Sequence, residues 1–240
     1  MESHALINPE IALLWAGIAI SILAVVFWPN RGLWARWRRT LQNTRRVRIE
    51  DALKHVYDCE YKQLTATHKS IAGALSISGD EVARLLERLE GLNLLRSEGE
   101  MLTLTEDGRA YALRVIRMHR LWERYLADET GVSETEWHYQ AEAKEHLLTI
   151  EQADALAVHM GNPSFDPHGD PIPTAAGELP ERRGIALTQL RPHQYAEVVH
   201  IEDEPTAVYA QLVAQGIHPG AHVRMISSDK NKIEVEVEGV

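Results

Sequence analysis

The chain has 240 residues, which is enough for one or two ordinary domains. Hydrophobic residues make up 45% and charged residues 25%, a globular balance that excludes wholesale disorder. The net charge of −10 argues against a generic nucleic-acid binder, and the single cysteine excludes both an internal disulfide framework and a four-cysteine zinc site.

An apolar run lies close to the start of the chain. Residues 11–28 contain no charge, and 18 residues are the lower limit for crossing a bilayer core of roughly 30 Å. Residues 31–48 then hold seven arginines, two tryptophans and no acid. We therefore predict a transmembrane helix over 9–29 and a basic juxtamembrane segment over 30–47. The protein would then cross the cell membrane once, and by the positive-inside rule the domains that follow the helix would lie in the cytoplasm.

Two alternatives to this anchor stay open. The apolar run could be a buried core helix, or the start of the chain could be wrongly assigned, in which case the protein would be cytoplasmic. A cleaved signal peptide fits poorly, because the basic residues follow the apolar run instead of preceding it. Residues 49–240 carry a net charge of −15, so DNA binding would need a local basic face, and a divalent-cation site would be well tolerated.

Three helices and a small hairpin are predicted after the basic segment. Their apolar residues recur at helical spacing and then alternate as in strands. The expected elements cover residues 48–60, 67–75, 79–92, 94–96 and 101–104. This order is typical of a winged helix-turn-helix domain, which we assign to residues 48–110.

The second half of the chain divides at a proline-rich stretch. Three helices are expected before it, over 105–129, 133–148 and 149–160, and five prolines break the pattern between residues 161 and 183. Strands over 196–201, 222–226 and 233–237, with a short helical stretch over 208–212, predict a small β-barrel. The domains are therefore an all-α domain over 111–173, a linker over 174–184 and a barrel over 185–240, and the fold class is α+β.

Possible metal ligands gather on two neighbouring helices. His119 and Glu123 stand four residues apart on the first helix. On the second, one stripe carries His138, Glu142, Glu145 and His146. Such a stripe presents carboxylates and an imidazole to one cation, and Asp51 in the first winged-domain helix is a candidate for completing the set.

A structural role is the alternative for the same residues. Glu123 could form a solvated salt bridge with Arg120 or Lys144, worth roughly 0–1 kcal/mol. A histidine near an apolar face is more often a hydrogen-bonded core residue than a ligand. No nucleophile motif or P-loop occurs, so no enzyme activity is predicted.

Several motifs carry a family resemblance. They read E-D-A-L-K-H-V-Y (50–57), L-T-x-x-G (104–108), M-H-R-L-W-E-R-Y-L (118–126), A-E-A-K-E-H (141–146) and G-N-P-S-F-D-P-H-G-D-P-I-P (161–173). With these motifs, residues 48–240 resemble the diphtheria toxin repressor family of metal-dependent transcriptional regulators. The stretches L-T-Q-L-R-P-H-Q (187–194) and G-I-H-P-G (216–220) resemble the FeoA-like, SH3-like barrel that ends its long members.

The resemblance implies a set of metal ligands. The primary site of the family falls on Asp51, Glu142, Glu145 and His146, and its other metal positions fall on His119, Glu123 and His138. Iron-type members place Met and Cys where this chain has Asp51 and Glu142, and these hard oxygen ligands favour Mn²⁺ over Fe²⁺. Zn²⁺ is not distinguished by the sequence.

Two positions depart from the manganese-type pattern. Lys54 stands where those members supply a further carboxylate, which argues against a second Mn²⁺ in the same cluster. His138 follows the iron-type pattern. Pro205 and Val208 occupy the aligned barrel positions, so no ligand is expected from the barrel, and Cys59 falls outside the site.

The expected function is repression of metal-uptake genes. The family resemblance implies a homodimer on a double-stranded DNA operator, read by the helix over 79–92 with Ser78, Glu81, Arg84 and Arg88 nearest the DNA. Acidic residues at the start of this helix are unfavourable beside phosphates.

A second reading gives the same domains another role. Residues 11–39 resemble the last membrane helix and basic tail of manganese, zinc and iron ABC transporter permeases. The alternative is therefore a membrane-tethered, metal-sensing regulatory domain of such a transporter that binds no DNA.

Overall fold

The computed structural model describes most of the chain after its first 44 residues. The described ranges are 45–181, 184–229 and 232–237, with Trp15, Ile18, Val25 and Val26 as isolated residues. Ile49–Val240 belong to one compact unit.

The predicted anchor cannot be followed in the structure. The segments 9–29 and 30–47 lie outside the described residues, apart from the isolated positions and the first turn of a helix that begins at Arg45. Among the helices that are described, none has both the length and the apolarity needed to cross a bilayer.

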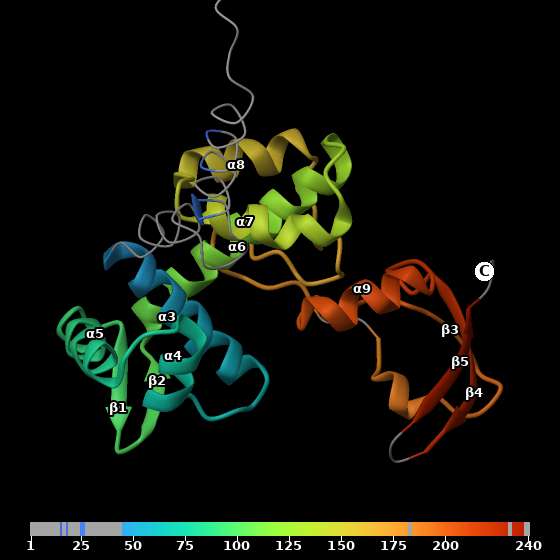
Figure 1. Ribbon diagram of the computed structural model, residues 1–240, viewed down its shortest axis with the longest axis horizontal. Helices are drawn as coiled ribbons and strands as arrows, with labels where there is room; N and C mark the ends of the chain where they lie inside the picture. The colour runs from blue at the N-terminus through green and yellow to red at the C-terminus, as the bar shows by residue number, and fades with distance from the viewer. Residues whose placement is uncertain are drawn as a thin grey trace, which may run out of the picture. The chain divides into compact units, whose positions relative to one another are not determined.

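A winged module follows Arg45 (Figure 1). Its elements are α3 (Arg45–Tyr61), α4 (His68–Leu75), α5 (Gly79–Gly91), β1 (Leu95–Glu98) and β2 (Met101–Leu104). The two strands pair antiparallel, with Leu95 opposite Leu104 and Glu98 opposite Met101. Gly99 takes a φ of +65° in the tight turn between them, a conformation that glycine adopts without a steric penalty.

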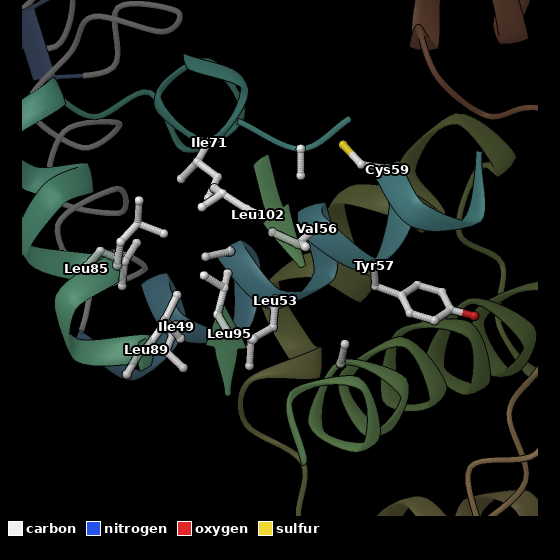
Figure 2. Packing of buried hydrophobic residues seen from close by; sticks show 14 of the residues in the cluster. Ile49, Leu53, Val56, Tyr57, Cys59, Ile71, Leu85, Leu89, Leu95 and Leu102 are labelled. Carbon is white, nitrogen blue, oxygen red and sulfur yellow. The ribbon is translucent and has the colours of Figure 1, made fainter. Parts of the chain in front are cut away.

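Apolar side chains from every element of this module meet in one core (Figure 2). Leu53, Val56, Ile71 and Leu89 are fully buried, and Leu102 of the wing is 1% exposed. Burial of each such side chain is worth about 1.5–3 kcal/mol. Because Leu53 and Val56 fix the inner face of α3, the polar residues on its other face are held at defined positions.

Local signals explain where the helices begin. Ser78 caps α5 by accepting a hydrogen bond from the Glu81 amide, and the Glu81 carboxylate accepts one from the Ser78 amide at 3.0 Å. Thr105 caps the next helix by accepting a hydrogen bond from the Gly108 amide at 3.0 Å. Gly108 in the first turn of that helix lies against Leu94, whose carbonyl oxygen would be 1.8 Å from an added Cβ, so no larger residue fits.

A helical module comes next in the chain. It comprises α6 (Glu106–Glu129), a 3₁₀ turn (Glu134–Glu136), α7 (Trp137–Glu145) and α8 (Ile150–His159). A second core forms between these helices around Leu121 and Leu148. The expected helix over 133–148 is therefore shorter than predicted, because the 3₁₀ turn occupies its start and α7 ends at Glu145.

The proline-rich stretch packs along α6. Arg117 donates to the carbonyl oxygen of Pro173 at 3.0 Å, and Arg120 donates to that of Pro171 at 2.6 Å. These bonds satisfy backbone acceptors in a segment that lacks regular structure.

The C-terminal module holds a small antiparallel sheet in the order β3-β4-β5, with β3 (Tyr195–Glu197), β4 (His222–Ser228), β5 (Ile233–Val237) and α9 (Thr206–Ala214). The first strand is shorter than the expected 196–201, because Ile201 donates its amide to the carbonyl of His168 at 2.9 Å instead of extending the sheet. In the same region Gly169 approaches Val199, whose carbonyl oxygen would be 2.0 Å from an added Cβ.

Candidate metal centres

Three predicted ligands converge where α3 meets the end of α7. One ligand atom each from Asp51, Glu145 and His146 lies within 4.8 Å of the others. His146 Nε2 is 3.2 Å from Asp51 Oδ1 and 3.5 Å from Glu145 Oε1. We call these three residues the primary centre; they belong to two different modules.

Glu50 supports the primary centre from behind. Its carboxylate is 1% exposed, and Oε2 lies 2.6 Å from His146 Nδ1. Tyr111 donates its hydroxyl to the other oxygen at 2.8 Å. A carboxylate on one ring nitrogen fixes the tautomer and directs the other nitrogen toward the ligand position, so Glu50 orients His146 Nε2 toward Asp51 and Glu145.

Glu145 is the most buried acid of the primary centre. Lys54 Nζ donates to its two oxygens at 2.9 and 3.1 Å, and His119 Nδ1 is in close contact with Oε2. Burial opposes the negative charge, but Lys54 and His119 outweigh it and hold the pKa of Glu145 at about 2. Burial also opposes the charge on His146, yet Asp51 and Glu50 raise the pKa of its imidazole to about 9.

Glu142 does not join the primary cluster. It lies about one turn before Glu145 on α7, is exposed, and places Oε1 3.6 Å from His138 Nε2. Its assignment as a fourth ligand therefore stays a prediction.

A second centre surrounds Glu123, which is 2% exposed. Glu123 Oε1 lies 3.0 Å from His119 Nε2 and 3.4 Å from His138 Nδ1. Asp203, from the C-terminal module, places Oδ2 2.9 Å from the same nitrogen of His138. No ligand was expected from this module, because Pro205 and Val208 occupy the aligned positions. Asp203, two residues before Pro205, nevertheless reaches the cluster.

Asp166 and His168 form a further group with Glu123. His168 Nδ1 lies 3.6 Å from Glu123 Oε2. Burial, followed by the charges of Glu123 and Asp170, raises the pKa of Asp166 to about 7. Two cation positions that share Glu123 are therefore available around the second centre.

The donors fit a divalent cation. His138 Nδ1 is buried and makes no well-aligned hydrogen bond, although carboxylates of Glu123 and Asp203 lie close to it. Burial disfavours a charge on His138, but Asp203, Glu123 and Glu142 raise the pKa of its imidazole to about 12. Carboxylates that crowd an imidazole in this way carry the excess negative charge that a divalent cation neutralises.

Comparison with known proteins gives two domain matches. Residues 105–174 match the family described as "Iron dependent repressor, metal binding and dimerisation domain", and residues 185–240 match the FeoA domain. The iron-dependent repressor IdeR of Mycobacterium tuberculosis is 31% identical over 201 residues, which cover 78% of this chain and 87% of IdeR. The chain belongs to the diphtheria toxin repressor family.

Two further comparisons, with a second repressor and with a solved structure, agree with this family. The diphtheria toxin repressor of Corynebacterium diphtheriae is 29% identical over 189 residues, with coverage of 74% of this chain and 83% of that protein. A solved structure described as "Manganese-dependent transcriptional repressor complex with manganese" superposes with a TM-score of 0.73 at 27% identity, over 80% of this chain and 90% of that one. The fold expected from the resemblance after residue 48 is thus confirmed as a mixed helix and sheet fold of the family.

The predicted recognition helix, α5, has a mixed surface. Arg84 and Arg88 are exposed on α5, and Ser78 is exposed at its start. Glu81 is partly buried, and its carboxylate accepts from both the amide and the hydroxyl of Ser78. A local capping role therefore accounts for the acid that was unfavourable for DNA binding.

Sequence reasoning missed four polar residues of these centres, namely Glu50, Asp166, His168 and Asp203. Asp166 and His168 lie inside the quoted motif at 161–173, so a signal was present without an assigned role. Glu50 likewise begins the motif at 50–57 without an assigned role, whereas Asp203 gave no local signal, because its partner His138 is distant in sequence.

Proposed function

We propose that the chain is a divalent-metal-dependent, DNA-binding transcriptional repressor of metal-uptake genes. One observation carries the proposal: a carboxylate of the winged module and two ligands of the helical module share the primary centre. Asp51, Glu145 and His146 would hold the cation. When bound, the cation supplies positive charge that offsets the mutual repulsion of the acids.

The consequence for DNA binding is geometric. With Asp51 and Glu145 held together, the angle between α3 and α7 has one value. In a two-fold dimer that angle sets the separation of the two α5 helices, which must match half-sites roughly 34 Å apart. Metal affinity and DNA affinity then rise together, because coupling between two binding sites is reciprocal.

We propose a homodimer formed through the helical module. Leu147, Ile150 and Val158 are large apolar side chains that are 71%, 51% and 68% exposed around α8. Several large apolar side chains exposed close together on one surface are typical of a protein–protein interface. The matched domain of the family is also described as a dimerisation domain.

The ligand set supports Mn²⁺, with Fe²⁺ as the other candidate. The primary centre offers carboxylate oxygens and one imidazole, and no sulfur ligand is present among its three residues. Hard oxygen donors suit Mn²⁺, whereas softer donors favour metals later in the series. We propose a second cation at His119, Glu123, His138 and Asp203, where it would join the C-terminal module to α6 and α7.

A membrane location remains a prediction. The apolar run over 11–28 and the arginines after it support a single-pass anchor. Alkaline carbonate extraction of membranes from cells that express the full chain tests it: an anchored chain stays in the pellet, and a chain found in the supernatant contradicts the anchor.

The repressor function is tested by selection from random duplex DNA. The full chain, purified in mild detergent, is used with and without MnCl₂, and binding to the enriched sequence is then measured by fluorescence anisotropy. Asp51→Asn should abolish the Mn²⁺ response. Asp58→Asn is the matched control, because Asp58 lies on the same helix but pairs with Lys62 at the surface. Mn²⁺-independent enrichment, or an unchanged response in Asp51→Asn, would refute the proposal.

A further inference from the structure

Lys54 occupies an unusual place for a lysine. It stands one turn after Asp51 on α3, its side chain is only 26% exposed, and its ammonium lies 2.9 and 3.1 Å from the two oxygens of Glu145. Glu145 is 1% exposed. The ammonium therefore sits on the carboxylate that the primary centre uses, and it connects the same two modules.

The charges around this ammonium are those of the metal site itself. Burial opposes the positive charge of Lys54, but Glu145, Glu142 and Asp51 stabilise it and raise its pKa. The nearest oxygen, Glu145 Oε1, is also the oxygen that faces His146 Nε2 at 3.5 Å. A divalent cation ligated by this oxygen must share it with a fixed positive charge, which weakens its binding.

We propose that Lys54 is a built-in counter-cation of the primary centre, which raises the metal concentration needed to fill it and limits it to one divalent ion. The inference rests on the proposed function of that centre. In the absence of metal, the ammonium of Lys54 partly neutralises the Glu145 carboxylate. With metal, its charge opposes a second ion beside Asp51 and Glu142.

Lys62 provides the contrast on the same helix. It follows the end of α3 and pairs with Asp58 at 3.3 Å and Glu202 at 3.6 Å, and its side chain is 37% exposed. Both lysines therefore neutralise acids, but only Lys54 contacts a residue of the primary centre. A change of charge at Lys62 is expected to leave metal binding as it is.

The test measures Mn²⁺ bound to the full chain by equilibrium dialysis and metal analysis, with Mn²⁺ electron paramagnetic resonance to detect neighbouring ions. Lys54→Met should tighten the Glu145-dependent ion about tenfold, because one positive charge is removed beside it. Lys54→Glu should bind one ion more than the wild type and show spin coupling between two ions. Lys62→Met should match the wild type.

Glu145→Gln separates this inference from the proposed function. If Glu145→Gln binds as many ions as the wild type, the primary centre is misassigned and the inference about Lys54 falls with it. If Glu145→Gln loses an ion while Lys54→Met and Lys54→Glu keep the affinity and stoichiometry of the wild type, the inference about Lys54 alone is overturned. Melting curves in EDTA show whether each variant folds.

Discussion

Glu50 offers the sharpest test of how the primary centre is positioned. Glu50→Gln keeps the shape of this buried side chain but removes its charge and one of its two acceptor oxygens. His146 Nδ1 and the Tyr111 hydroxyl both donate to the wild-type carboxylate, at 2.6 and 2.8 Å. In the variant only one of the two donors can keep an oxygen partner, so His146 loses either its orientation or the basicity that the carboxylate gives its imidazole.

The expected loss of Mn²⁺ affinity follows from the role of the hydrogen bond between Glu50 and His146, which orients a metal ligand. Changing a group that orients a metal ligand typically costs 10–100-fold in affinity, about 1.4–2.7 kcal/mol. Tyr111→Phe removes only the more distant hydrogen bond, worth about 0.5–1.5 kcal/mol, and should lower the affinity less. Both effects are read as the Mn²⁺ dissociation constant from isothermal titration calorimetry.

Glu60→Gln is the matched control for this experiment. Glu60 lies on the same helix, and its carboxylate also accepts two hydrogen bonds, from the Leu104 amide at 2.8 Å and from Arg109. These partners belong to the wing and α6, away from the primary centre. Glu60→Gln should lower the melting temperature and leave the Mn²⁺ affinity unchanged. An affinity within threefold of the wild type for Glu50→Gln would refute the role given to Glu50.

Four other predictions concern His146, Asp203, Leu53 and Arg88. Because the pKa of His146 is raised to about 9, its imidazole holds a proton at pH 7 that must leave when Nε2 ligates a cation. The affinity for Mn²⁺ should therefore rise by up to about tenfold per pH unit between pH 6 and 8. An affinity that does not change with pH in titration calorimetry would contradict this. Asp203→Asn replaces the carboxylate beside His138 by an amide, which is a weaker metal ligand. Metal analysis should show that the ion of the second centre is lost and that the ion of the primary centre is kept. Leu53→Ala should cost about 2–5 kcal/mol in urea unfolding with EDTA present, because the side chain is fully buried; a loss below 1 kcal/mol would place it outside the core. Arg88→Ala should weaken binding to the selected DNA and reduce its salt dependence at saturating Mn²⁺, while the bound metal stays constant.

Local chemistry made the winged module readable from the sequence. The Ser78 cap with Glu81 three residues later, and the Thr105 cap, place the starts of α5 and α6 where the pattern predicted them. The apolar spacing along α5 also matches its buried face, which contains Val82 and Leu89. Boundaries were less certain where no cap exists, as at the start of α7, where the side chain of the N-cap residue Glu136 makes no capping hydrogen bond.

The metal centres were readable only in part. Glu145 and His146 are neighbours in sequence and share a stripe, so local spacing brought them together, while Asp51 was a candidate from another helix that the family resemblance then assigned to the site. Glu50 and Asp203 depend on contacts with residues 96 and 65 positions away, and periodicity carries no information at that distance. Spacing placed Glu142 one turn after His138, but it did not show that Glu142 lies outside the primary cluster.

The two centres share a support between them. His119 contacts Glu145 of the primary centre through Nδ1 and Glu123 of the second centre through Nε2. As a ligand of the second centre through Nε2, His119 would still carry a proton on Nδ1 and donate it to Glu145. A ligand in one centre would then orient a ligand in the other, in the way that Glu50 orients His146. Glu145 is thereby held by groups from α3 and α6, which explains why a buried acid on the last residue of α7 keeps its charge and its direction.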